Sequence, residues 1–163
     1  MTKDSDFEIR SAIPTEAGAI ADVHLLSHRE TYVPLLGEAN YWPVDPTERL
    51  AEWRRVLAGE DIVLVAIAAG RVVGFCHAEG ARIHTLYILP AWHRHGIGRA
   101  LLAELCRRLA ARGVARACFA VLAVNKKAIA FYEALGARAT CNTIVEEGGL
   151  RYEDRLFEIA TGG

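Results

Sequence analysis

The most informative stretch of this sequence is residues 86–102, LYILPAWHRHGIGRALL. Its first residues predict the end of a β-strand, and an apolar repeat of helical spacing begins at Ile97. Between the two lies a basic turn that contains Gly96 and Gly98. Helix N-termini present unpaired N–H groups and a partial positive charge, and glycine allows close approach to the backbone. The stretch therefore predicts an anion-binding cradle, for which a diphosphate is the natural ligand.

Two common phosphate-binding motifs do not fit this turn. A dinucleotide motif would need a third glycine at the position of Leu101, and a Walker-type loop would need a Gly-Lys-Ser/Thr sequence that the chain lacks. His93 and His95 are spaced for chelation, but no nearby carboxylate or thiol completes a site, so we expect no metal. The alternative is that the two glycines only make a tight turn.

Toward the N-terminus, the sequence predicts an antiparallel meander of three strands, at 62–69, 71–79 and 82–89, joined by tight turns. A helix should precede it, capped by Asp45 and ended by Gly59, with Pro46 at the first helical position. The elements before these are expected to be a strand at 7–10, a helix capped by Thr15, a separate short helix at 29–36 and an irregular loop at 37–44.

Toward the C-terminus, an amphipathic helix is predicted over 97–112, with Glu104 and Arg108 as an i,i+4 pair on its polar side. Its apolar seam consists of Ile97, Leu101, Leu105 and Leu109. A buried strand at 114–121, a helix capped by Asn125 and a hairpin of strands at 140–146 and 150–159 follow. This order predicts an α/β (α+β) fold, a mixed, mostly antiparallel central sheet flanked by helices on both faces.

Two motifs make the chain resemble the GCN5-related N-acetyltransferase (GNAT) superfamily. The basic turn follows the acyl-CoA-binding pattern Arg/Gln-x-x-Gly-x-Gly/Ala, except that His93 stands at its first position. Residues 125–136, NKKAIAFYEALG, resemble the second CoA-side motif, N-x-x-A-x-x-F-Y-x-x-x-G. The resemblance extends from residue 7 to residue 159. It implies one GNAT-like domain over residues 1–163, acetyl-CoA as co-substrate, and N-acetyl transfer by direct attack of a primary amine.

The resemblance also implies a cofactor site on the matching residues. Main-chain groups of Ile88 would contact the acetyl carbonyl and the pantetheine arm, Asn125 would lie near the pantetheine, and Phe131 would line the CoA slot. The residues expected to bind the cofactor are Ile88, Leu89, His93, Arg94, His95, Gly96, Ile97, Gly98, Arg99, Asn125, Ala128 and Phe131.

Acyl transfer to an amine needs a group that takes a proton and a group that gives one. By resemblance, Tyr132 would protonate the departing thiolate, although its helical spacing with Phe131 and Leu135 also fits core packing. An alkylamine with a pKa near ~10.4 is almost wholly charged at neutral pH, so a base must accept its proton. Glu79 and His84 are the candidate bases. Alternatively, Glu79 is only a solvated turn residue and His84 only a partly buried histidine of the strand.

The acceptor is expected to meet the first helices and the loop after them, where His28, Tyr32, Tyr41 and Trp42 are candidate walls. The alternative is that Tyr41 and Trp42 only cover the core. The acceptor could be a small-molecule or a peptide amine. The sequence also leaves open a homodimer formed through the closing hairpin, and an acyl-CoA other than acetyl-CoA as the donor. The competing function is a non-catalytic module of the same fold that senses acyl-CoA.

Composition bears on the partners and the compartment. The formal net charge of −1 provides no basic field for nucleic acid or an anionic membrane. The longest apolar run, 62–69, is too short to span a bilayer, and no signal-peptide pattern is found, so we expect a cytoplasmic protein. The four cysteines contain no Cys-x-x-Cys spacing and are expected to be buried free thiols: Cys76, Cys106, Cys118 and Cys141.

Overall fold

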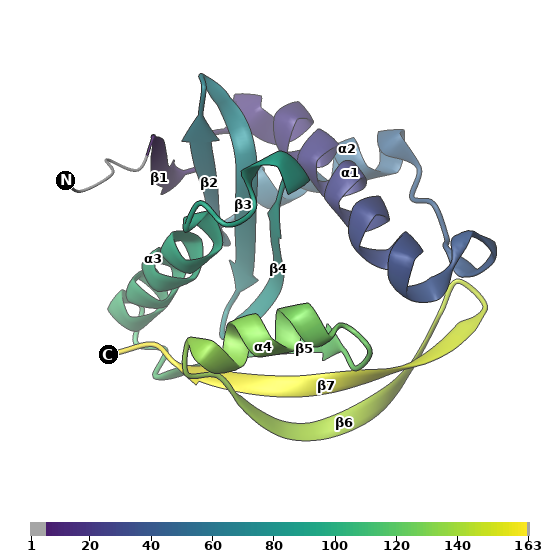
Figure 1. Ribbon diagram of the computed structural model, residues 1–163. Helices are drawn as coiled ribbons and strands as arrows, with labels where there is room; N and C mark the ends of the chain where they lie inside the picture. The colour runs from purple at the N-terminus through teal and green to yellow at the C-terminus, as the bar shows by residue number, and fades with distance from the viewer. Residues whose placement is uncertain (1–5, 163) are drawn as a thin grey trace.

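The computed structural model describes residues 6–162, which fold around a seven-stranded sheet (Figure 1). The strand order is β1-β2-β3-β4-β5-β7-β6, and every neighbouring pair is antiparallel except β4 and β5. The predicted fold class is therefore confirmed. The strands are β1 Phe7–Ser11, β2 Ile62–Ala68, β3 Arg71–Glu79, β4 Arg82–Ile88, β5 Arg116–Leu122, β6 Arg138–Glu147 and β7 Leu150–Ala160.

Helices cover both faces of the sheet. On one face, α1 and α2 pack over a core that contains Trp53 and Phe75, and on the other face α3 and α4 pack over a second core (Figure 1). The predicted apolar seam of α3 is buried at all four positions, with each side chain at most 1% exposed. Fully burying one such aliphatic side chain contributes about 1.5–3 kcal/mol. The helices are α1 Ala17–Leu36, α2 Pro46–Ala58, α3 Ile97–Ala111 and α4 Lys126–Ala134, with short 3₁₀ turns at Pro14–Glu16, Glu38–Asn40 and Pro90–Trp92.

Two predictions for the N-terminal region are wrong, and both concern α1. The predicted break before residue 29 is absent, since α1 runs unbroken over 20 residues and includes Pro34 in its last turn. Thr15 does not cap the helix, because it lies inside the 3₁₀ turn that precedes it. The Glu16 carboxylate instead accepts the Ile13 N–H at 2.9 Å and pairs with Arg10 at 2.6 Å. An ionised acceptor makes the stronger hydrogen bond, so it organises this helix start.

The start of α2 is confirmed. The Asp45 carboxylate accepts from the N–H groups of Thr47 at 2.7 Å and Glu48 at 3.1 Å, and Pro46 occupies the first helical position. Such a cap stabilises a helix by about 1 kcal/mol because it satisfies N–H groups that have no partner within the helix.

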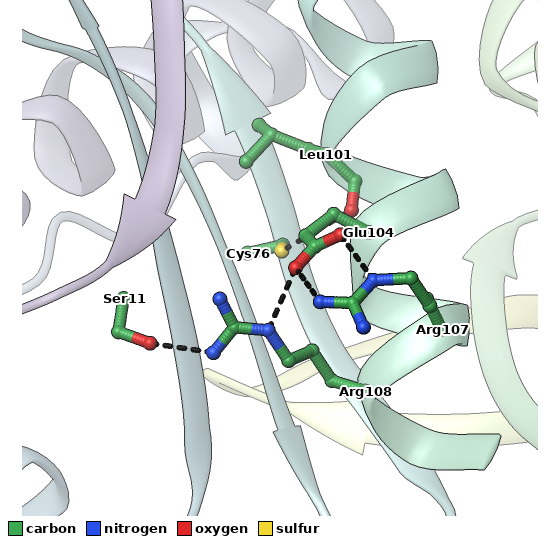
Figure 2. A network of polar contacts seen from close by, with 6 residues as sticks. All are labelled: Ser11, Cys76, Leu101, Glu104, Arg107 and Arg108. Atoms are coloured by element: carbon green, nitrogen blue, oxygen red, sulfur yellow. Dashed lines mark hydrogen bonds and ion pairs between the residues drawn. The ribbon is translucent and has the colours of Figure 1, made fainter. Parts of the chain in front are cut away.

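Polar contacts fasten α3 to the sheet (Figure 2). Glu104 pairs with Arg107 at 2.6 Å and with Arg108 at 2.7 Å, which confirms the predicted pair and lowers the pKa of Glu104 to about 2. The Arg108 guanidinium also donates to the Ser11 hydroxyl on β1 at 2.7 Å. The Arg108–Ser11 hydrogen bond ties the helix that begins at the basic turn to the edge strand β1.

The cysteine prediction is half right. Cys76 and Cys106 are buried free thiols, whereas Cys118 and Cys141 are exposed. Cys118 points away from the α3 side of β5, and Cys141 lies on the edge strand β6, which is exposed along nearly its whole length. None of the helices in residues 6–162 has the length and apolar character needed to cross a bilayer.

Candidate active site

The parallel strands β4 and β5 diverge, and their divergence opens a cleft in the sheet. They pair in register only at Arg82 and Cys118, next to a hydrogen bond from the Cys118 N–H to the Ala81 carbonyl at 2.9 Å. Beyond this point the two strands share no ladder, and a cavity of about 850 Å³ lies between them. Main-chain groups of β4 on this side are therefore available to a ligand. The cavity is also lined by the basic turn and by α4.

The basic turn has the backbone of an anion site. Gly96 precedes α3 with φ +82°, and Arg94 also takes the left-handed conformation, with φ +62°. For a residue with a side chain this conformation costs on the order of 1–3 kcal/mol, and such strain clusters at ligand sites. The first N–H groups of α3 have no partner within the helix. Residues 96–99 line the cavity, as does Arg94, so the turn can present these groups to a diphosphate.

The two glycines of the turn serve different purposes. Open space surrounds the position where Gly96 would carry a Cβ, so this residue is needed for its left-handed φ. A Cβ on Gly98 would lie 3.0 Å from Ile88 Cδ1 and 3.2 Å from Phe131 Cζ. Gly98 therefore lets the start of α3 pack tightly against β4 and α4.

The two histidines of the turn bond to main-chain carbonyls. His93 Nε2 lies 2.8 Å from the Ile88 carbonyl oxygen, and His95 Nδ1 lies 2.8 Å from the His93 carbonyl oxygen. A carbonyl only accepts, so each of these ring nitrogens donates its proton. His93 thus ties the turn to the end of β4 from the position where the GNAT pattern has Arg or Gln. It lines the cavity, whereas His95 and Leu89 are outside the lining.

The second motif brings α4 to the same cavity. The Asn125 side chain caps this helix by accepting the Ala128 N–H at 3.2 Å, and Phe131 and Tyr132 line the cavity. The Tyr132 ring packs on Phe119, with ring centroids 4.5 Å apart, and within residues 6–162 its hydroxyl makes no hydrogen bond. Burial raises the pKa of Tyr132, and Cys76 adds to the effect. Core packing and access to the cavity thus coexist at Tyr132.

The structure joins the two candidate bases into one pair. His84 Nε2 lies 3.0 Å from Glu79 Oε2. His84 lines the cavity, whereas Glu79 does not. His84 is the extra residue of a β-bulge, since His77 pairs with Thr85 and Ala78 with Ile83. Bulges turn side chains out of the regular alternation and recur beside active sites.

The comparisons with known proteins bear on this cleft. The model of the acetyltransferase (GNAT) family matches residues 23–137, which is more than half of the chain and includes both motifs. The chain belongs to the GNAT family. The predicted resemblance is thereby confirmed.

A curated relative matches one part of this GNAT chain. The [ribosomal protein bS18]-alanine N-acetyltransferase of Escherichia coli strain K12 is 45% identical over 58 residues, which make up 36% of this chain and 39% of the relative. The matched part therefore spans about two fifths of that relative.

Solved structures agree with the fold over nearly the whole chain. A GCN5-related N-acetyltransferase from Rhodopseudomonas palustris superposes with a TM-score of 0.78 at 20% identity and 94% coverage of both chains. The yncA structure from Salmonella typhimurium, determined with its cofactor acetyl-CoA, gives a TM-score of 0.76 at 20% identity and covers 96% of this chain and 95% of its own. At these identities the likeness shows the fold.

The predicted acceptor residues of this GNAT chain fall into two layers. Tyr32 lines the cavity, whereas His28 and Trp42 lie behind it. The His28 ring contacts the Tyr32 ring at a tilt of 41°, with centroids 4.5 Å apart, and His28 Nδ1 lies 3.1 Å from the Tyr41 hydroxyl. Burial lowers the pKa of His28 to about 4, and Arg49 contributes. Of the predicted acceptor residues, Tyr32 lines the cavity and is contacted by His28 and Trp42, and their role toward the acceptor stays a prediction.

Sequence reasoning missed three residues on the acceptor side. Tyr87 lines the cavity, and burial raises its pKa. Tyr152 and Asp154 come from β7, and burial together with Glu147 raises the pKa of Asp154. The alternation of Tyr152 and Asp154 along a strand placed them on one face, but no local pattern indicated that Tyr152 meets Trp42 in the loop after α1. Within residues 6–162, no cluster of three His, Cys, Asp or Glu side chains is positioned to hold a metal.

Proposed function

We propose that this GNAT-family chain transfers an acetyl group from acetyl-CoA to a primary amine, without a covalent enzyme intermediate. One observation supports this most directly: a single cavity is lined both by the helix start that can bind a diphosphate and by Tyr132. The local match to an alanine N-acetyltransferase and the family membership support the same activity.

The residues of the cofactor side fit acetyl-CoA. The unpaired N–H groups at the start of α3, its dipole, Arg94 and Arg99 would hold the pyrophosphate. The free side of β4 around Ile88 would hold the pantetheine arm, with Asn125 and Phe131 on the opposite wall. When bound, acetyl-CoA supplies a thioester already activated for attack.

Tyr132 and His84 divide the proton transfers in this proposal. Tyr132 would donate its phenolic proton to the departing sulfur, since its raised pKa keeps it protonated at neutral pH. His84 would take a proton from the acceptor amine, directly or through one water, while Glu79 orients the imidazole.

The proposal extends to the setting of the enzyme. We infer a cytoplasmic protein in which residues 1–163 act as one GNAT domain. The exposed edge strand β6 offers a surface through which two copies could pair, as an isologous dimer would require.

An assay of CoA release tests the proposed function. Acetyl-CoA is incubated with the protein and a panel of amines that includes diamines, amino acids and a peptide beginning with alanine. We expect CoA thiol to appear only when an accepted amine is present, and propionyl-CoA in parallel tests the choice of donor. Tight binding of acetyl-CoA without amine-dependent thiol release from the whole panel would instead support the non-catalytic sensor.

A further inference from the structure

The acceptor end of the cleft is bounded by a contact between two segments far apart in sequence. Figure 1 shows the turn between β6 and β7 reaching the loop that follows α1. There the Trp42 ring stacks on Tyr152, with centroids 5.7 Å apart and planes 10° from parallel. A Cβ on Gly148 would lie only 2.9 Å from Trp42 Cγ, so the indole rests directly on the hairpin turn.

This contact continues into the cavity as a wall of aromatic rings. Tyr32 lines the cavity, and its ring centroid is 6.4 Å from that of Trp42. Tyr32, Trp42 and Tyr152, which we call the aromatic wall, therefore link the cavity to the hairpin. An aromatic ring attracts cations to its open face, and Tyr32 is the ring of this wall that lines the cavity.

Two carboxylates stand beside the aromatic wall. Asp154 follows Tyr152 by two positions on β7 and so shares its face of the sheet. It pairs in register with Leu122, which lines the cavity. Glu147 accepts a hydrogen bond from the Tyr152 hydroxyl at 2.7 Å. Within residues 6–162 neither carboxylate takes part in a salt bridge. At Asp154 the effects of partial burial and of the Glu147 charge outweigh the opposing charge of Arg82, so this place is favourable for a further cation.

We propose that the acceptor is a small aliphatic amine with a second positive charge, which is held between the aromatic wall and the carboxylates of Asp154 and Glu147. This inference rests on the proposed function. The amine nitrogen that attacks the thioester must lose its positive charge first. The positive charge that stays bound to the aromatic wall and the carboxylates must therefore lie at the other end of the acceptor. The acceptor is small because Trp42 closes this end of the cleft, and a polypeptide would have to displace it from the hairpin.

A matched pair of amines tests the charge. We compare kcat/KM for 1,4-diaminobutane and n-butylamine, which have the same chain length and differ by one ammonium group. We expect the diamine to be preferred at least about 10-fold, and the preference to fall toward unity in Asp154→Asn and in the double variant Asp154→Asn/Glu147→Gln. Glu153→Gln is the control, because Glu153 is the neighbouring carboxylate on the opposite face of β7, bonded to Asn142 at 2.6 Å.

Equal kcat/KM for the two amines in the wild type would overturn the inference, as would full discrimination in the double variant. Each variant is first checked for acetyl-CoA binding, which should stay unchanged because both carboxylates lie outside the cofactor side. Tyr152→Phe is a milder variant that removes only the hydrogen bond to Glu147, and it should lower the preference partly.

A peptide beginning with alanine tests the size limit. The wild type should acetylate it with lower kcat/KM than the diamine, and Trp42→Leu should narrow that gap while leaving the KM for acetyl-CoA unchanged. A wild type that prefers the peptide would refute the small acceptor and leave the proposed function standing. Absence of transfer to every amine, despite acetyl-CoA binding, would refute both.

Discussion

The two halves of the cleft are built in different ways. The cofactor half comes from two short segments, residues 88–99 and 125–132, and each contains a strand end or loop followed by a helix start. The acceptor half comes from α1, the loop after it and the β6–β7 hairpin. Trp42 in that loop and Gly148 in the hairpin turn are in contact although they lie more than 100 residues apart in the sequence. Local sequence thus specifies the half that binds the donor, while packing between distant segments specifies the half that selects the acceptor.

The two halves also differ in polarity. The cofactor half offers a helix N-terminus and the guanidinium groups of Arg94 and Arg99, which suit an anionic donor. The acceptor half offers aromatic rings and the carboxylates of Asp154 and Glu147, which suit a cationic acceptor. The reaction would then take place where the halves meet, at Tyr132.

The largest effect is expected at that meeting point. Tyr132→Phe removes one hydroxyl and keeps the ring that packs on Phe119, so the fold and acetyl-CoA binding should survive. General acid catalysis is worth about 10²–10⁴-fold, and we expect kcat to fall by at least about 10²-fold. Steady-state kinetics with direct binding measurements checks this. A variant as fast as the wild type would mean that water or another group protonates the thiolate.

A single substitution in the cofactor half should abolish binding of the donor. At 100 times its dissociation constant, CoA should add about 2.7 kcal/mol to the free energy of unfolding. Gly96→Glu should lose this stabilisation through bulk and like charge, as measured by urea unfolding with and without CoA. Gly96→Ala carries the same left-handed strain in open space, so it is the control and should retain binding. Undiminished CoA stabilisation of Gly96→Glu would exclude the proposed cradle.

Acid should destabilise the fold through a buried histidine of α1. His24 is 5% exposed and accepts the Trp53 indole N–H at 3.1 Å, and burial lowers its pKa to about 3. Above pH ~6.5 it is neutral in both states, but as the pH falls toward 3 only the unfolded chain takes up the proton. Stability should therefore decrease by about 2 kcal/mol between pH 7 and pH 5 from this residue alone.

His24→Gln isolates this contribution. Glutamine can still accept from Trp53 but does not titrate, so urea unfolding of the variant should show a correspondingly weaker loss between pH 7 and pH 5. An unchanged pH dependence would show that His24 is already protonated in the folded protein or that other groups dominate.

The smallest effect is expected on the outer side of the cofactor half. The hydrogen bonds of Arg107 and Arg108 hold the pKa of Glu104 at about 2, so the carboxylate stabilises the fold above its usual pKa and loses this effect as the pH falls from about 5 toward 2. Arg107 is largely solvated and Arg108 is partly so, and Glu104→Gln should therefore cost at most about 1 kcal/mol at pH 7. In contrast to the His24 effect, this cost should be nearly the same at pH 5. Urea unfolding at both pH values measures it, and added salt should reduce it.

Much of the cleft was predictable because its signals are local. The turn with Gly96, the cap at Asn125 and the spacing of Phe131 and Tyr132 each depend on neighbours within a few residues, and the structure brings them to one cavity. The meander, the seam of α3 and the fold class follow from the same short-range periodicities. The unbroken α1 was missed because packing over the sheet can override a local break, and Thr15 was misread because Glu16 competes for the same helix start.

The sequence by itself determined the strands, the helices other than α1, the two motifs of the cofactor half and the GNAT resemblance, because hydrophobic period, capping and glycine conformation act within one or two turns of chain. Only the tertiary structure decided that Glu79 and His84 form one pair, that His93 braces β4, and that Trp42 meets the β6–β7 hairpin. These contacts depend on a β-bulge, on the divergence of β4 from β5 and on packing between segments remote in sequence. Such contacts leave no periodic pattern in the sequence, because the position of each residue depends on the distant segment of the chain against which it packs.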